Sequence, residues 1–256
     1  MTPRIAIPIL HSTDPEFADR AMPQYERAVE LAGGEPVRVA LDQTAAQVMK
    51  IIEHCDGVLL PGSKADVDPA RFGAAERSPH TKAADPRRDI VDELLLQDAY
   101  NMRKPVLGIC YGLQSLNVYH TGSLVQHIPD FLPEALRTKV DHAVGGKVAI
   151  AHEVEVSPDS RLAEILDRKL VLPVNSSHHQ SADVVGDGLR IGARCREDGV
   201  IEALEGTSPD HFVLAVQWHP ERSVDNDEAS RAIFRALVEA AAERHRQLTG
   251  ELEGRR

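Results

Sequence analysis

Short apolar runs alternate with longer amphipathic stretches over the first half of the chain, and one more apolar run follows near its end. This alternation is typical of a parallel β-sheet whose two faces are covered by helices. The predicted strands lie at 4–9, 36–40, 57–61, 105–109 and 212–218, and the predicted helices at 16–32, 43–54, 87–102 and 111–120.

The segment between these two parts has a different pattern, in which short apolar runs are separated by glycine turns. It predicts a small set of antiparallel or edge strands, which would form a wall on one side of a pocket. These strands are expected at 147–156, 170–174, 189–195 and 200–205.

The end of the chain predicts one long helix over 224–245, because its apolar residues repeat on a single face that would pack on the sheet. We expect one domain over 1–246, followed by a polar tail at 247–256 that frays. Residues 62–86 contain several prolines and scattered charge, so we interpret them as a long mobile excursion and not as a domain linker.

Composition narrows the class of protein. The 256 residues suffice for one α/β domain with a substantial core, and 29 Lys and Arg against 40 Asp and Glu give a net charge of −11 without a basic stripe. This charge argues against nucleic-acid binding. The chain has no apolar run of membrane-spanning length and no signal-peptide pattern, and its three cysteines are an odd number, so we expect a cytoplasmic protein with free thiols that spans no membrane. A homodimer is left open.

A cysteine stands where a buried apolar strand gives way to a helix. Cys110 lies between Gly108 and Gly112, which allow a sharp turn that exposes the sulfur, and the following helix directs its free N–H groups toward it. Such a position lowers the pKa of a thiol and suits a nucleophile. The alternative is a small buried hydrophobic residue, which is a common fate of a free cysteine.

A second segment supplies what a cysteine nucleophile needs. Another apolar strand runs into His219, and Glu221 follows two residues later, so that both side chains point the same way on an extended chain. The carboxylate can then orient the imidazole, which acts as the base. A histidine at a strand end can also be a capping residue, but the two motifs together indicate a Cys110, His219 and Glu221 triad.

These residues resemble the class I glutamine amidotransferase superfamily, and within it the γ-glutamyl hydrolase-like branch (peptidase C26 type) that includes γ-glutamyl-γ-aminobutyrate hydrolases. The resemblance implies a flavodoxin-like three-layer α/β sandwich with a mainly parallel sheet and a small antiparallel addition. It covers most of the chain. The segments that carry it are 57–63, 66–69, 108–112, 174–180, 198–202 and 217–221.

Acyl transfer through a thiolate produces an oxyanion, which needs preorganised donors. We assign them to the backbone N–H of Tyr111 and to one in the Gly62–Ser63 turn after the predicted strand 57–61. Two of these positions depart from the pattern of the family that the chain resembles. Ser63 stands where that pattern has a glycine, and Tyr111 stands where many members have an arginine.

The resemblance also implies substrate contacts. Gln114 lies one helical turn after the nucleophile, and His178, His179 and Gln180 belong to a polar loop that would line the γ-glutamyl pocket. Gln114 could instead satisfy backbone groups. Paired histidines suggest a metal, but no further ligands stand at helpful spacing, so we expect no metal and no cofactor.

The sequence therefore predicts a cysteine-dependent hydrolase of a γ-glutamyl amide in a small substrate such as γ-glutamyl-γ-aminobutyrate, acting through a glutamyl thioester. One alternative is a glutaminase component that delivers ammonia to a separate synthase. Another is a binding module that has kept the fold and lost catalysis.

Overall fold

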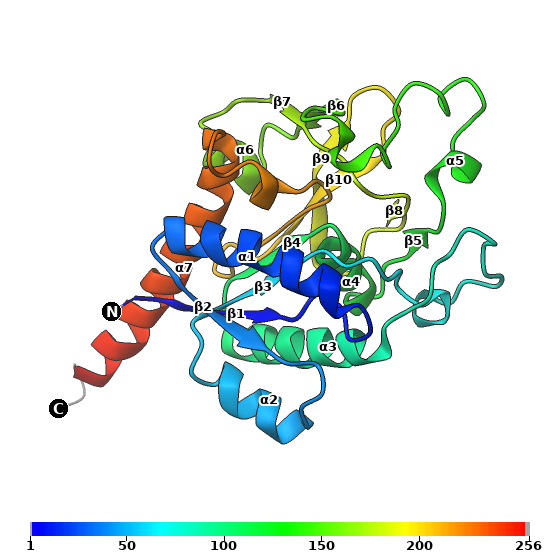
Figure 1. The fold of residues 1–256 in the computed structure, drawn as a ribbon. Coiled ribbons are helices and arrows are strands. Elements are labelled where there is room, and N and C mark those ends of the chain that lie inside the picture. Colours follow the sequence, from blue (N-terminus) through cyan, green and yellow to red (C-terminus); the bar gives the residue numbers. More distant parts are fainter. Residues whose placement is uncertain (1, 254–256) are drawn as a thin grey trace.

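A computed structural model describes residues 2–253 of the chain. Nine strands form one sheet in the order β2-β1-β3-β4-β11-β10-β9-β6-β7. Helices cover both faces, so the predicted α/β fold with a mainly parallel central sheet is confirmed (Figure 1).

The parallel half of the sheet consists of the apolar runs that the sequence predicts as strands. From the edge inward, its strands are β2 (Glu35–Val39), β1 (Arg4–Pro8), β3 (Gly57–Leu60), β4 (Val106–Ile109) and β11 (Val213–Val216), and each is parallel to the next. With β11 as the fifth strand this is the flavodoxin-like order 2-1-3-4-5. The three inner strands, β3, β4 and β11, are buried along their whole length, as expected for strands covered on both faces.

The antiparallel half extends the sheet beyond β11. It contains β10 (Ile201–Gly206), β9 (Leu189–Cys195), β6 (His152–Val156) and β7 (Val171–Val174), each antiparallel to its neighbour. The predicted antiparallel addition is therefore present, and it continues the main sheet.

Two apolar cores separate the sheet from its helices. On one face α1 (Pro15–Leu31) and α7 (Glu228–Glu253) pack against each other and against the strands (Figure 1). On the other face α2 (Ala45–Ile52), α3 (Pro86–Met102) and α4 (Tyr111–Tyr119) form the second core. The carboxyl ends of the parallel strands thus open at one edge of a closed three-layer body.

Several short elements were not predicted from the sequence, because segments of two to five residues carry little periodicity. They connect the main elements and shape the loops around the strand ends. They are β5 (Leu124–Val125), β8 (Ser181–Ala182), α5 (Ile128–Phe131), α6 (Arg161–Ile165) and the 3₁₀-helices η1 (Pro69–Phe72), η2 (Gly145–Lys147) and η3 (Pro220–Arg222).

The strand predicted at 147–156 begins only at His152, because η2 and a loop occupy the residues before it. The predicted last helix also differs at both ends. It starts at Glu228, after Asp227, whose carboxylate accepts a hydrogen bond from the N–H of Ser230 at 2.8 Å. It then runs to Glu253 and so enters the tail that was expected to fray; residues 254–256 of that tail lie outside the described part.

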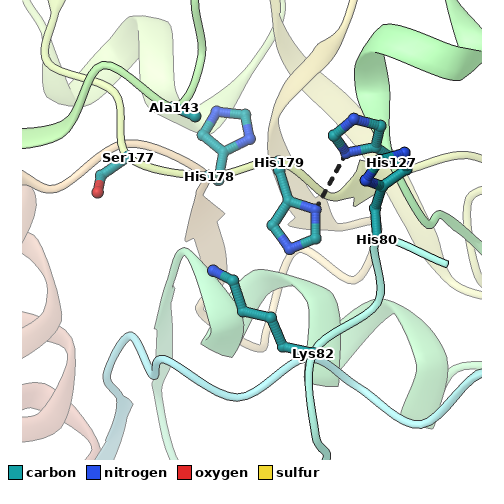
Figure 2. A pocket seen from close by; sticks show the side chains of 7 residues that line it. All are labelled: His80, Lys82, His127, Ala143, Ser177, His178 and His179. Carbon is teal, nitrogen blue, oxygen red and sulfur yellow. Dashed lines mark hydrogen bonds between the residues drawn. The ribbon is translucent and has the colours of Figure 1, made fainter.

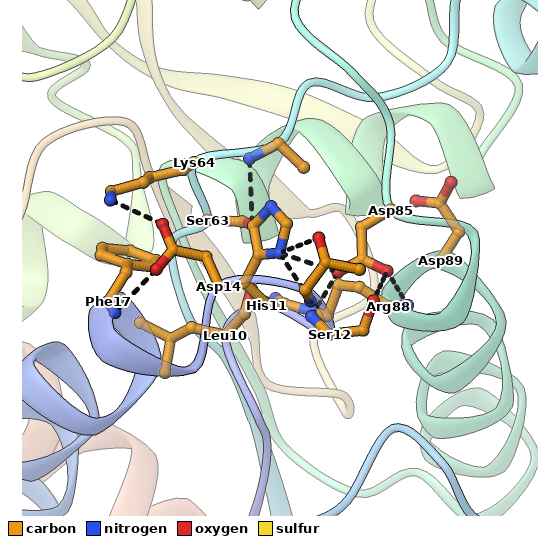
Figure 3. A network of polar contacts seen from close by, with 12 residues as sticks. Leu10, His11, Ser12, Asp14, Phe17, Ser63, Lys64, Asp85, Arg88 and Asp89 are labelled. Carbon is orange, nitrogen blue, oxygen red and sulfur yellow. Dashed lines mark hydrogen bonds and ion pairs between the residues drawn. The ribbon is translucent and has the colours of Figure 1, made fainter.

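The excursion at 62–86 is attached to the body at several points (Figure 3). Lys64 forms an ion pair with Asp14 at 2.7 Å, next to the start of α1. At the other end, Asp85 accepts hydrogen bonds from the backbone N–H and the hydroxyl of Ser12 at 2.6 and 2.7 Å. Both ends of the excursion are therefore held beside α1 and α3.

Among residues 2–253, no helix is both long enough and apolar enough to cross a membrane.

Candidate active site

The turn from β4 into α4 places Cys110 in a backbone conformation that few residues adopt. Its φ and ψ are 53° and −103°, and its N–H donates to the carbonyl of Val216 on the neighbouring β11 at 2.8 Å. The turn depends on Gly112, where a Cβ atom would lie 2.1 Å from the carbonyl oxygen of Leu60. The glycine after the cysteine is therefore required by the close approach of β3.

The strand order brings the predicted base, His219, to the predicted nucleophile, Cys110. Because β11 is the parallel neighbour of β4, with Val216 paired to Ile109, both strands end at the same edge of the sheet. His219 follows the end of β11, and its Nδ1 lies 2.8 Å from Oε1 of Glu221 in η3. This hydrogen bond leaves Nε2 of the imidazole for the thiol of Cys110.

Charges around His219 favour its imidazolium form. Burial by itself disfavours a charged imidazole, but the negative charge of Glu221 and the thiol of Cys110 outweigh it and raise the pKa of His219 to about 9. The imidazole can therefore hold a proton at neutral pH, which a general acid requires.

An asparagine fixes the backbone of His219. Asn175, at the end of β7, accepts a hydrogen bond from the N–H of His219 at 2.9 Å and donates one to its carbonyl oxygen at 2.8 Å. Both backbone groups of the histidine are thus held by one buried side chain. The loop after β7 is thereby coupled to the position of the imidazole.

A cavity of about 310 Å³ opens beside these residues. His219 and Glu221 line it, together with the turn after β3 and one face of α1. Four cationic side chains also line it, which the net charge of the chain does not suggest. The cationic residues are Arg20, Lys64, Lys82 and Arg222.

The cations of the cavity differ in how far they are already paired. Lys64 is bound to Asp14, and Arg222 lies 3.5 Å from Glu221. Arg20 and the ammonium of Lys82 form no ion pair with a carboxylate among the described residues. These two side chains can therefore meet the negative charge of a ligand.

The turn after β3 offers two backbone N–H groups for the predicted second oxyanion donor, and one of them is already used. The N–H of Gly62 already donates to the hydroxyl oxygen of Tyr25 at 3.1 Å, so it is not a free donor. The N–H of Ser63 donates to no backbone acceptor within residues 2–253, and Tyr111 begins α4, so its N–H has no partner in the helix. Burial, followed by the charge of Glu221, raises the pKa of Tyr25, which keeps its hydroxyl protonated.

Gly62 has a different importance. A Cβ atom there would lie 3.0 Å from the Tyr25 hydroxyl oxygen and 3.1 Å from Cε1 of His219. The missing side chain therefore lets the imidazole and the turn after β3 approach each other.

The side chain of Tyr111 points away from the cavity. It is buried against the guanidinium of Arg88, whose Cζ lies 5.0 Å from the ring centroid, and its hydroxyl donates to Asp89. Only the backbone of Tyr111 thus belongs to the site.

The residues predicted to contact substrate do not line this cavity. Gln114 is buried and donates to the carbonyl oxygen of Gln180 at 3.2 Å and to Oε1 of Gln217 at 3.3 Å, which agrees with the alternative that it satisfies internal groups. The side chain of Gln180 is also buried. The loop reaches the cavity through Ser177 instead.

His178 and His179 line a neighbouring cavity of about 330 Å³ (Figure 2). His179 is bound to Asp66 at 3.0 Å. Lys82 and Ser177 line both cavities, so the two cavities are adjacent at these side chains.

One group of residues has the composition of a metal site. Ligand atoms of His142, His152, His178 and Glu202 lie within 4.8 Å of one another, and all four residues are buried. The expectation of no metal considered only spacing along the chain, and three of these residues come from segments far from the paired histidines.

Sequence reasoning missed the cations of the cavity and also Tyr25. They lie on a helix face and in loops, where Arg, Lys and Tyr are ordinary surface or core residues and give no signal. Asn175 stood in the segment 174–180 but was given no role.

Three comparisons place the chain among known proteins. The peptidase C26 family model matches residues 10–221. Over 219 residues the chain is 38% identical to "Putative glutamine amidotransferase Rv2859c" of Mycobacterium tuberculosis, covering 85% of this chain and 66% of that protein. Over 222 residues it is 35% identical to gamma-glutamyl-gamma-aminobutyrate hydrolase PuuD of Escherichia coli, covering 85% and 84%.

A solved structure supports the fold. The glutaminase domain of Trypanosoma brucei CTPS with bound acivicin superposes with a TM-score of 0.62, at 17% identity and over 94% of each chain.

Proposed function

This chain belongs to the peptidase C26 family of class I glutamine amidotransferase-like proteins, and we propose that it is a cysteine-dependent hydrolase of a γ-glutamyl amide bond in a small substrate. The substrate class is γ-glutamyl-γ-aminobutyrate or a related γ-glutamyl amine. The observation that carries the proposal is the arrangement of Cys110, His219 and Glu221 beside a cavity with free cationic side chains.

In the first step, the sulfur of Cys110 attacks the γ-carbonyl carbon and forms a C–S bond. His219 takes the thiol proton and gives it to the leaving nitrogen, so that the C–N bond breaks and a neutral amine departs. The product is a glutamyl thioester on Cys110. Glu221 holds the imidazole in orientation through both proton transfers.

In the second step, water attacks the thioester carbonyl while His219 accepts one of its protons. The C–S bond then breaks, the sulfur regains its proton from the imidazole, and glutamate leaves. Both steps pass through an oxyanion, for which the N–H groups of Tyr111 and Ser63 are the proposed donors. Loss of one such donor costs on the order of 3 kcal/mol of transition-state stabilisation.

The α-carboxylate of a γ-glutamyl group needs a cation in a chain of net charge −11. Arg20 and Lys82 line the cavity without an ion pair to a described carboxylate, which supports their binding it. A local positive wall can bind an anion even where the long-range field of the protein is negative.

The test is glutamate release by the purified protein alone, from γ-glutamyl-γ-aminobutyrate, from other γ-glutamyl amines and from glutamine. Cys110→Ala should abolish release and leave the thermal midpoint of unfolding within a few degrees of wild type. Cys55→Ala is the matched control, because burial raises the pKa of the Cys55 thiol to about 11 and it lies outside the cavity. Release that survives Cys110→Ala in a clean preparation refutes the assigned nucleophile.

The same assay separates the alternatives. A glutaminase component would release glutamate slowly from glutamine alone and faster once its synthase is added, with little turnover of γ-glutamyl amines. A binding module would bind these compounds and turn none over. Covalent labelling of Cys110 by a thiol-reactive glutamine analogue distinguishes a reactive thiolate from an inert cysteine.

A further inference from the structure

Four buried side chains converge behind the loop that follows β7. His142 precedes η2, His152 begins β6, His178 lies in the loop after β7, and Glu202 lies in β10. Their side chains are at most 3% exposed. A group of three imidazoles and one carboxylate is thus buried in the protein, and it is separate from the proposed catalytic residues.

The distances within this group match a tetrahedral metal site. Oε1 of Glu202 lies 3.2 Å from Nδ1 of His142, 3.4 Å from Nε2 of His152 and 3.5 Å from Nε2 of His178. Metal–ligand bonds of 2.0–2.1 Å in a tetrahedron place neighbouring ligand atoms about 3.3 Å apart. The three distances from Glu202 are therefore close to the separation that a shared zinc ion requires, and all four ligand atoms lie within 4.8 Å of one another.

The atoms that face the centre have no hydrogen-bond partner within residues 2–253. The same three imidazole nitrogens and both carboxylate oxygens of Glu202 are buried and lack a hydrogen-bond partner of acceptable geometry among the described residues. Buried polar atoms are almost always satisfied, and a group of five that is not requires an explanation. A metal ion at the centre would satisfy four of them together.

The opposite ring nitrogens are held by acceptors. Nε2 of His142 lies 2.8 Å from a carboxylate oxygen of Asp198, while Nδ1 of His178 lies 2.9 Å from the carbonyl oxygen of Gln180. Nδ1 of His152 lies 3.3 Å from the carbonyl oxygen of its neighbour in β6. Each acceptor favours the tautomer that carries its proton on the outer nitrogen. In a neutral ring the inner nitrogen then presents a lone pair to the centre of the group. This outer support is typical of histidines that bind metals.

Charge balance also fits a divalent ion. The side chains of Asp198 and Glu202 are both fully buried and carry two negative charges. Three neutral imidazoles with one divalent cation make the group neutral. The competing arrangement is a proton on His142: burial opposes it, but the hydrogen bond to Asp198 and the nearby negative charge of Glu202 raise the pKa of His142 to about 11.

We propose that His142, His152, His178 and Glu202 bind a divalent transition-metal ion, with zinc as the best match, in a closed structural site. Three nitrogens and one carboxylate oxygen suit zinc, whereas magnesium and calcium prefer oxygen ligands throughout. All four positions are filled by protein, so the ion has no open position for substrate. Its role is to fix the loop from Asn175 to Gln180, and through Asn175 the backbone of His219.

The test starts with the wild-type chain, purified without a polyhistidine tag and without chelators. Mass spectrometry of its metals should find about one zinc ion per chain. Removal of zinc by a strong chelator should lower the thermal midpoint of unfolding by about 5 °C or more, and added zinc should restore it. Cobalt in place of zinc should give the intense visible absorption of a tetrahedral site, a readout that requires no variant and no activity.

Variants then locate the ion. His152→Ala and Glu202→Gln should each lose most of the bound zinc and the cobalt absorption. His211→Asn is the matched control, since His211 is equally buried but bonds the carbonyl of Lys104 far from the group, and it should keep the metal.

Two results overturn the proposal. One is a wild-type protein that is purified without metal and takes up neither zinc nor cobalt in equilibrium dialysis, which would leave a proton on His142 as the occupant. The other is full metal content in both ligand variants, which would place the ion elsewhere, for example at the exposed His80 and the half-buried His127.

Discussion

Replacing Glu221 by glutamine tests the electrostatics of the catalytic pair most directly. The change keeps the size of the side chain and removes its charge, 2.8 Å from Nδ1 of His219, where both side chains are almost fully buried. No cavity is created, so the fold should persist. The altered quantity is the stability of the imidazolium.

The magnitude follows from the pKa of His219. A rise from 6.5 to about 9 corresponds to about 3 kcal/mol in favour of the charged ring, at 1.36 kcal/mol for each pH unit. Burial acts in the opposite direction, so the charge of Glu221 and the Cys110 sulfur must supply this rise and offset the desolvation as well. Without the carboxylate charge, we expect the pKa of His219 to fall to its ordinary value or below, and kcat/KM at neutral pH to fall about 100-fold.

The assay is the pH dependence of glutamate release between about pH 6 and about pH 10. In the proposed mechanism the imidazolium donates the proton to the leaving amine, so wild-type activity should fall as pH rises through about 9. In Glu221→Gln this alkaline limb should move down by about two pH units. Glu228→Gln, on the exposed start of α7, is the control and should leave the profile unchanged.

An alkaline limb that stays near pH 9 in Glu221→Gln would refute the reasoning, because the charge of Glu221 would then not control the imidazole. A normal rate in the variant would remove Glu221 from the catalytic group altogether.

Two further predictions concern stability, both measured by urea unfolding. Gly112→Ala puts a Cβ atom 2.1 Å from the carbonyl oxygen at the end of β3 and should cost about 3 kcal/mol or abolish folding, whereas Gly146→Ala meets no atom within 4 Å and should be neutral; equal effects would contradict the tight turn. Arg88→Met leaves Asp92 buried without its 2.6 Å partner and should cost about 3–5 kcal/mol. The exposed Arg27→Met should cost about 1 kcal/mol or less, and a similarly small loss for Arg88→Met would show that the buried pair contributes little.

The parallel half of the fold could be predicted because its strands are buried on both faces and read as continuous apolar runs. The ends of the elements were harder to predict from the sequence. The last helix continues past the apolar stripe because side chains on its surface pair with one another, as Arg246 does with Glu243. Such pairs stabilise a helix without any apolar repeat.

The candidate triad could be proposed from the sequence because each part is local: a cysteine between glycines, and a histidine two residues before a glutamate. The cavity could not, since Arg20 and Lys82 come from a helix and a loop that meet only in the folded chain. For the same reason, the group around Glu202 could not be predicted from the sequence. Its residues are spread over about 60 positions, and the pairing of β6 with β7 and β9, and of β9 with β10, brings their segments together.

The pairing of β4 with β11 has a consequence for the newly made protein. The thiol of Cys110 leaves the ribosome a hundred residues before His219, and until β11 inserts between β4 and β10 no imidazole stands beside it. During synthesis the cysteine therefore lacks the imidazole that the proposed mechanism requires. The proposed catalytic group is complete only once the sheet has closed, so an incomplete copy of the chain does not contain it.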